Sequence, residues 1–175
     1  MFNVGSGYDP AYGILDTLSA YGLVQSMFVM GWLADQNPGL VQAIASYGHP
    51  VGTHGYCMSG PYSLAAAARY PDRIAAAASF YGTWLVSDAV ESPHLTLGKA
   101  KGELYISCAE HDELAPPEMV KELKALFDKS GAKGELEVHP TVHHGFAFPQ
   151  RWCYDKPAAE RHWERLIALY RRNLG

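Results

Sequence analysis

The stretch HGYCMSG, residues 54–60, follows the short apolar segment PVGT and precedes PYSL and an alanine run. This order is typical of a strand, a sharp turn and a helix. Gly55 and the small Ser59 flank Cys57, and small neighbours let strand and helix pack closely while the central residue takes an unusual dihedral angle. The helix directs free backbone N–H groups at the turn, which favours a thiolate at Cys57. The pattern predicts a nucleophile elbow with Cys57 as its reactive residue.

Two other interpretations of this stretch remain open. A cysteine between small residues is more often a buried structural thiol than a nucleophile. Ser59 is a rival nucleophile, but no glycine frames it, because Cys57 and Pro61 stand two residues away on either side. The elbow interpretation therefore depends on an acid and a histidine elsewhere in the chain.

The composition is that of an ordinary globular protein. A length of 175 residues suits one domain, residues 1–175, with a substantial core. The formal net charge is −4 and no lysine or arginine cluster stands out, so nucleic acid is not an expected partner. Cys57, Cys108 and Cys153 are odd in number and far apart, which indicates free thiols in a reducing compartment. With no signal peptide visible at Met1–Val4, we expect a cytoplasmic protein.

The segment Leu18–Ala34 is strongly apolar, with few polar residues in it. It is slightly short for a membrane span and is interrupted by Gly22 and Gly31. We expect a helix buried by the core or by a partner, and no contact with a membrane.

Apolar patterns and breaker residues predict the elements on either side of the elbow. Two helices are expected before it, and after it strands that alternate with helices, which indicates an α/β protein with a parallel sheet and flanking helices. The alanine-rich segment has the helix propensity of alanine, but its place between two turns favours a buried strand. The expected helices are Asp16–Asp35, Leu40–Tyr47, one opened by Pro116 and Pro117, and Lys156–Arg172 capped by Asp155; the expected strands are Val51–Tyr56, Ile74–Tyr81, Leu104–Ala109 and Glu135–His139.

Polar residues follow two of the predicted strands. In open parallel sheets the chemistry lies at the carboxyl ends of the strands. Asp112 follows the first of these strands, and His143 and His144 follow the second. Nucleophile, acid and histidine thus occur in the chain order of an α/β-hydrolase triad. In such a triad the thiolate attacks a carbonyl, the histidine transfers the proton, and the carboxylate orients the imidazole.

A metal site is the other interpretation of the paired histidines. His111 or His139 would have to complete it together with His143 and His144. Neighbouring histidines rarely share a face, and no carboxylate or cysteine completes a recognised ligand spacing. We therefore expect no metal.

Taken together, these motifs resemble the dienelactone hydrolase family. The resemblance covers roughly residue 16 to the end. It implies an α/β-hydrolase fold and a Cys-Asp-His triad that acts on small-molecule lactones or esters, without metal or cofactor. The segments that carry it are Gly55–Gly60, Asp112 with Leu114–Pro116, His144–Phe146, Phe80–Gly82, Tyr154-Asp155 and Ala158–Trp163.

By motif, the resemblance assigns the triad to Cys57, Asp112 and His144. His144 is chosen over His143 because it precedes the Gly-Phe pair. The backbone N–H of Met58 would be one oxyanion donor. Four aromatic residues are candidates for lining a mostly apolar substrate pocket, although ordinary core packing is an equal alternative for each. These candidates are Tyr56, Tyr81, Trp84 and Phe146, with Phe148 beside them.

The sequence departs from the family pattern in two places. The family usually has glycine where Ser59 stands. Its fold also begins with several strands before the elbow strand, which carry the second oxyanion donor, and this chain has no room for them. We therefore expect an N-terminally incomplete domain in which Val51–Tyr56 lies at an exposed sheet edge. A partner chain, an identical copy in a homo-oligomer, or residues outside this chain would cover that edge.

The leading functional hypothesis is a cysteine-dependent carboxylic-ester or lactone hydrolase, whose activity as this chain alone is expected to be weak. A truncated or degenerate family member that serves as a binding or interaction module is the first alternative. A redox or thiol-sensing protein that uses Cys57 is the second.

Overall fold

A parallel β-sheet forms the centre of the computed structural model, which describes residues 10–22, 27–28 and 36–174. Neighbouring strands in the chain are also neighbours in the sheet, in the order β1-β2-β3-β4-β5, and every pair is parallel. The strands are β1 (Met27–Phe28), β2 (Val51–Tyr56), β3 (Ile74–Phe80), β4 (Glu103–His111) and β5 (Gly134–His143).

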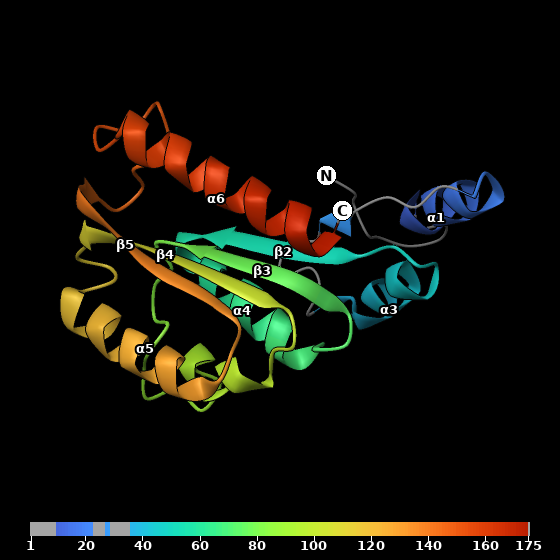
Figure 1. The fold of residues 1–175 in the computed structure, drawn as a ribbon, viewed down its shortest axis with the longest axis horizontal. Coiled ribbons are helices and arrows are strands. Elements are labelled where there is room, and N and C mark those ends of the chain that lie inside the picture. Colours follow the sequence, from blue (N-terminus) through green and yellow to red (C-terminus); the bar gives the residue numbers. More distant parts are fainter. Residues whose placement is uncertain (1–9, 23–26, 29–35, 175) are drawn as a thin grey trace.

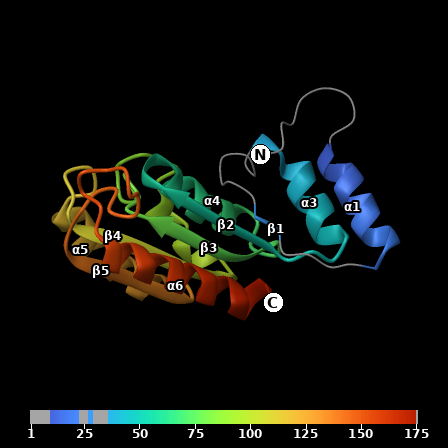
Figure 2. The same cartoon turned by 90° about the horizontal axis from the view of Figure 1, so that it is seen from above.

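Helices cover both faces of this sheet (Figure 1). One face is covered by α6 (Lys156–Leu174), and the other by α4 (Gly60–Arg69) and α5 (Pro117–Ser130). Beyond the end at which the strands begin, α1 (Pro10–Ala20) and α3 (Pro38–Ser46) lie side by side (Figure 2). The short 3-10 turns are η1 (Cys57–Ser59), η2 (Pro93–Leu95) and η3 (Leu97–Lys99).

The alanine-rich segment is a strand, as predicted from its position. In β3, Ala76, Ala78 and Phe80 face the core beneath α6, whereas Ile74 and Ala77 face the opposite core. Small side chains on both faces let helices pack closely against the strand. Burial on both sides therefore outweighs the helix propensity of alanine.

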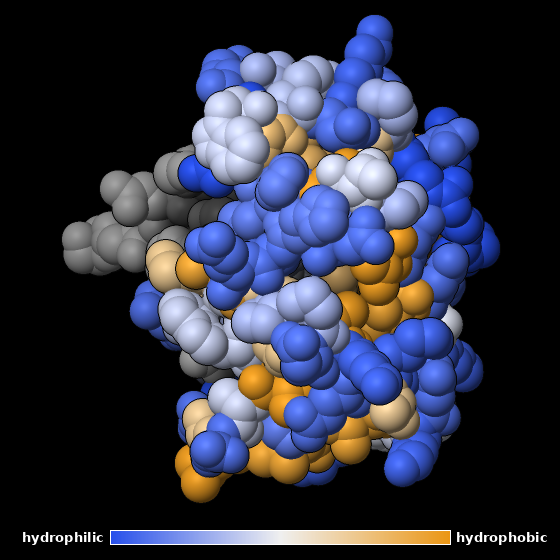
Figure 3. Space-filling model, turned by 90° about the vertical axis from the view of Figure 1, so that its left-hand side faces the viewer, coloured by the Kyte–Doolittle hydropathy of each residue, from blue (hydrophilic) through white to orange (hydrophobic). Residues whose placement is uncertain are grey.

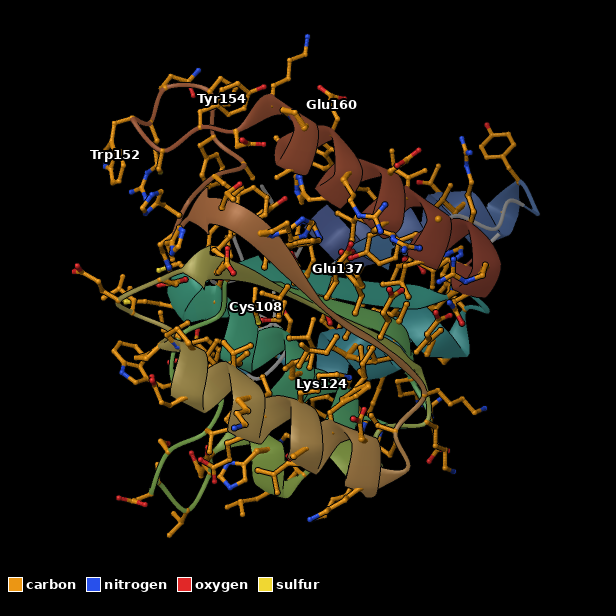
Figure 4. The ribbon with its side chains drawn as sticks, turned by 60° about the vertical axis from the view of Figure 1, so that its left-hand side comes forward. Cys108, Lys124, Glu137, Trp152, Tyr154 and Glu160 are labelled. Atoms are coloured by element: carbon orange, nitrogen blue, oxygen red, sulfur yellow. The ribbon has the colours of Figure 1, made fainter. Side chains whose placement is uncertain are left out.

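Charged groups as well as apolar ones hold α6 on the sheet. Glu137 lies on β5 beneath this helix (Figure 4) and accepts hydrogen bonds from the Tyr105 hydroxyl, at 2.6 Å, and from Arg161. Burial alone would raise the pKa of Glu137, but these hydrogen bonds outweigh it and lower the pKa. At the start of the helix, Asp155 Oδ1 accepts the N–H of Ala158 at 2.9 Å, so the predicted cap is confirmed.

The expected helix over Asp16–Asp35 is wrong. Helix α1 ends at Ala20, Gly22 adopts a φ of 64°, and Met27–Phe28 forms a strand that pairs in parallel with Val51–Gly52. A continuous apolar run suits a buried strand as well as a buried helix, so its pattern did not separate the two. The rest of the expected helix, residues 23–26 and 29–35, lies outside the described residues.

The expectation that no strand precedes the elbow strand is corrected by the same pairing. β1 covers the outer edge of β2 at Val51–Gly52. Within the described part of the chain, no strand covers that edge along Thr53–Tyr56.

After residue 36 the expected strands and helices are confirmed, with some ends displaced. β4 and β5 run further than expected, to His111 and His143. The acid and the histidine of the predicted triad therefore follow their strands at once. Among the described residues, no helix has the length and apolar character needed to span a membrane.

Candidate active site

The elbow is a strained turn between β2 and α4. Cys57 has a φ of 53°, a left-handed conformation that is uncommon outside glycine. A Cβ atom on Gly55 would lie 2.1 Å from the Ser59 carbonyl oxygen, and one on Gly60 would lie 2.8 Å from the Gly82 Cα. The turn therefore needs glycine at positions 55 and 60, in agreement with the prediction that the neighbours of Cys57 must be small.

Ser59 uses its hydroxyl to hold the backbone of the elbow. Its Oγ accepts the N–H of Tyr56 at 2.8 Å and donates to the Tyr56 carbonyl at 2.7 Å. A hydroxyl engaged in both directions is poorly placed to attack a substrate. The structure thus gives Ser59 a role in shaping the turn.

A buried carboxylate and a histidine meet where β4 and β5 end. Asp112 Oδ2 lies 2.8 Å from His144 Nδ1, and its Oδ1 accepts the N–H groups of Leu114 and Ala115 at 2.9 and 3.0 Å. Because a carboxylate only accepts, Nδ1 carries the hydrogen and Nε2 keeps its lone pair. Nε2 is buried, and no hydrogen-bond partner for it occurs among the described residues. Its lone pair is therefore not used by another group in this part of the chain.

The neighbouring His143 lies elsewhere. Its ring packs against the rings of His111, at 5.2 Å between centroids, and of Trp152, at 5.1 Å. His143 is exposed. The carboxylate of Asp112 thus contacts His144 and not its neighbour.

Tyr81, directly after β3, connects the elbow with the histidine. Its ring lies 4.9 Å from that of His144 and 5.8 Å from that of Tyr56. Burial, and then the nearby Tyr56, raise the pKa of Tyr81, which also interacts electrostatically with Cys57. The N–H of Thr83 donates to the Cys57 carbonyl at 3.3 Å. The residues directly after β3 therefore contact both the backbone of the elbow and the ring of His144.

The three cysteines differ sharply in environment. Cys57 is partly exposed, whereas Cys108 and Cys153 are buried. Cys108 lies in the sheet (Figure 4), where burial, and then the charge of Asp112, raise its pKa to about 12. The thiol of Cys153 donates to the His144 carbonyl at 3.0 Å. Of the three cysteines, Cys57 is thus the one that is partly accessible to solvent.

The aromatic residues predicted to line a pocket occupy different depths. Trp84 is 60% exposed, whereas Tyr81 and Phe146 are almost completely buried. Tyr56 is half-buried, and its hydroxyl contacts His162. Trp84 is thus the most exposed of these residues, and Tyr81 and Phe146 pack in the core beneath α6.

Further apolar side chains are exposed in the segments that follow the strands, and Figure 3 views the molecule from the side on which the strands end. Met58 and Leu114 are more than half exposed, and Phe148 packs its ring 5.3 Å from that of Tyr56. Trp152 projects from the loop between β5 and α6 (Figure 4). Sequence reasoning missed Leu114 and the side chain of Met58. The available signal was their position, next to Asp112 and Cys57 in loops at the carboxyl ends of strands.

No three histidine, cysteine, aspartate or glutamate side chains of the described residues converge in a way that could hold a metal ion. His111, His139, His143 and His144, the histidines that the sequence raised as ligands, are divided between the surface and the core.

Comparisons with known proteins agree with this architecture. A model of the dienelactone hydrolase family matches residues 33–174. The chain is 27% identical over 133 residues to "Putative carboxymethylenebutenolidase" of Aquifex aeolicus, covering 74% of this chain and 54% of that protein. It is 26% identical over 125 residues to "Protein usf" of Aquifex pyrophilus, covering 71% and 52%. The chain thus spans about half the length of the curated relatives it matches.

A solved structure shares the fold. The Klebsiella pneumoniae protein named "Putative Dienelactone Hydrolase" superposes with a TM-score of 0.69 at 20% identity, covering 81% of this chain and 62% of that one. The family match extends over most of the present chain, including the elbow and the Asp112–His144 pair. The chain therefore belongs to the dienelactone hydrolase family.

Proposed function

We propose that this protein hydrolyses a carboxylic ester or lactone of a small molecule, with Cys57, His144 and Asp112 as its catalytic triad. The observation that carries the proposal is the hydrogen bond of 2.8 Å between the buried Asp112 and His144, which lies at the same end of the sheet as the Cys57 elbow. The contacts of Tyr81 with both parts of this site support their acting together.

In the proposed reaction His144 Nε2 first takes the proton of the Cys57 thiol, and the resulting thiolate attacks the carbonyl carbon to form a tetrahedral intermediate. The carbon–oxygen bond of the alcohol then breaks, and His144 Nε2 gives its proton to the departing oxygen. A water molecule loses a proton to Nε2 as it attacks the thioester, and the carboxylic acid leaves with the thiolate restored. Asp112 stabilises the imidazolium form of His144 throughout. The N–H of Met58, at the start of the turn, is the proposed oxyanion donor.

The rim of the site supports an apolar substrate. Met58, Trp84, Leu114 and Phe148 expose large apolar side chains in the segments that follow β2, β3, β4 and β5. Such surfaces favour a substrate with an apolar acyl or alcohol group, since contact with them removes apolar area from water.

Point variants assayed with a nitrophenyl ester test this function. Replacing Cys57 or His144 by alanine should reduce turnover by several orders of magnitude, whereas the matched control His143→Ala should change it little. An equal loss in His143→Ala, or retained turnover in Cys57→Ala, would contradict the proposed triad. If Cys57 reacts with alkylating agents but no ester is hydrolysed, the thiol-sensing or binding alternatives would be favoured.

Location and assembly form a further part of the proposal. Three free cysteines support a reducing compartment such as the cytoplasm.

We also infer that a second copy of the chain covers the outer edge of β2 beyond Gly52, because strand edges pair readily with other chains. Light scattering over a range of concentrations should then detect a dimer, and a monomer at every concentration would contradict this assembly.

A further inference from the structure

Tyr56, the residue before the candidate nucleophile, is joined to α6 by a partly buried hydrogen bond. Its hydroxyl oxygen lies 2.7 Å from His162 Nε2, and His162 Nδ1 lies 2.7 Å from the carbonyl oxygen of Ala159. Because a carbonyl only accepts, Nδ1 carries the hydrogen. Nε2 therefore accepts from the Tyr56 hydroxyl. The hydrogen bond therefore runs from the Tyr56 hydroxyl to His162 Nε2, and the hydrogen of the His162 ring stays on Nδ1.

Aromatic packing holds this pair in place. The ring of Tyr56 stacks on that of Phe80 at 5.1 Å, and the ring of His162 meets Phe80 edge-on at 4.6 Å. His162 is completely buried. Burial raises the pKa of Tyr56 to about 12 and lowers that of His162, so both groups are neutral near pH 7. The titratable groups that act on His162 from the packed elements are His139 on β5, His54 on β2 and Glu160 on α6.

The backbone of Tyr56 is held as firmly as its side chain. Both its N–H and its carbonyl group bond to the Ser59 hydroxyl. The next residue, Cys57, has the left-handed φ of 53°. A strained conformation of this kind persists only where the surrounding structure holds it. The bond to His162 supplies one of these constraints from a helix that lies 106 residues away in the chain.

We propose that Tyr56 and His162 form a positioning pair, which holds the elbow against α6 and thereby sets the reactivity of Cys57. Neither residue needs to touch the substrate. The inference rests on Cys57 being the reactive thiol of the proposed function. The proposal gives α6, a helix that carries no residue of the proposed triad, a part in setting the reactivity of Cys57.

The structure offers a matched control for this pair. His54 Nδ1 lies 3.1 Å from the hydroxyl of Tyr170, so a second tyrosine–histidine contact joins the same strand and the same helix. This contact lies three residues before Cys57 and does not involve the elbow. Tyr56→Phe and Tyr170→Phe therefore each remove one hydroxyl between β2 and α6. Only Tyr56→Phe removes a hydrogen bond from the residue next to Cys57.

The test is the rate of alkylation of Cys57 by iodoacetamide, followed by peptide mapping over a range of pH. Tyr56→Phe should slow the reaction about 10- to 100-fold and alter its pH profile, since small displacements of a reacting group have effects of this size. Tyr170→Phe should leave rate and profile close to those of the wild type. His162→Gln, which restores an acceptor for the Tyr56 hydroxyl, should retain most of the reactivity that His162→Leu loses.

Three outcomes would overturn the inference. One is equal alkylation of Tyr56→Phe and Tyr170→Phe when circular dichroism shows both folded, since the bond would then be only structural. Equal reactivity of His162→Gln and His162→Leu is another. An unreactive Cys57 in the folded wild type is the third, because there would be no reactivity to position. Alkylation at Cys57 with no ester turnover would refute the proposed hydrolase while leaving the positioning pair open to the same comparison.

Discussion

Replacing Asp112 by asparagine changes the hydrogen pattern of the site with almost no change of shape. The natural carboxylate accepts the N–H groups of Leu114 and Ala115 on one oxygen and His144 Nδ1 on the other. An asparagine that keeps its oxygen on the two backbone groups turns its NH2 group towards Nδ1. Nδ1 must then accept, so the hydrogen moves to Nε2, the nitrogen that the mechanism needs as a base.

The cost to stability should be modest and the cost to catalysis large. A hydrogen bond to a charged group contributes about 1.5–3 kcal/mol, and one between neutral groups about 0.5–1.5 kcal/mol. The two backbone bonds therefore lose roughly 1 kcal/mol each, and removal of a buried charge offsets part of this loss. The wrong histidine tautomer lowers kcat about 10⁴-fold in a serine protease, and we expect a loss of that order here.

Three measurements on the same variant check this reasoning. Urea unfolding should show a decrease of about 2 kcal/mol or less, a nitrophenyl ester assay should show the large loss of turnover, and ¹⁵N NMR should find the hydrogen on Nε2. Glu110→Gln is the control, because Glu110 is an exposed acid near the end of β4, two residues before Asp112, and accepts the Thr141 N–H. An Asp112→Asn protein with its hydrogen still on Nδ1, or with turnover close to that of the control, would refute the argument.

Three further predictions address the thiols, the buried histidines and the turn. Iodoacetamide should label Cys57 and spare Cys108, because burial raises the pKa of Cys108 to about 12; the opposite preference in peptide mapping would contradict this. Acidification from about pH 7 to about pH 5 should lower the free energy of unfolding measured in urea. The pKa values of three histidines are lowered by burial in the folded chain, so the unfolded chain, with histidine pKa values near 6.5, binds more protons in this range. Unchanged stability would contradict this prediction. These histidines are His54, His139 and His162. Gly55→Ala should destabilise the fold by about 1–3 kcal/mol through its clash with the Ser59 carbonyl, whereas the control Gly39→Ala, whose Cβ would find only an ordinary 3.8 Å contact, should be tolerated.

Local patterns were enough to predict strands β2 to β5 and the elbow. The spacing of small residues around Cys57 reports a steric requirement of the turn, and the clashes that a Cβ would make at Gly55 and Gly60 show its physical origin. The strand assignment of Ile74–Phe80 followed from its place between two turns, although alanine favours helices. The pairing of Asp112 with His144 could be anticipated because parallel strands bring their carboxyl ends to one edge of the sheet.

Pairing between distant segments was decided by tertiary structure. Met27–Phe28 is a strand because the start of β2 offers it backbone partners, and nothing in an apolar run specifies that partner. Burial was equally inaccessible from the sequence. Tyr81 and Phe146 are aromatic like Trp84, but only the packing beneath α6 determines that they are enclosed while Trp84 is exposed.

The sequence by itself determined which residues carry the candidate chemistry, because nucleophile, acid and histidine each follow a strand whose local pattern can be recognised. It did not determine what holds them. The contact of Tyr56 with His162 joins residues 106 positions apart, and only the packing of α6 on the sheet brings these side chains together. Hydrogen bonds of this kind depend on distances across the folded core, which no local pattern encodes.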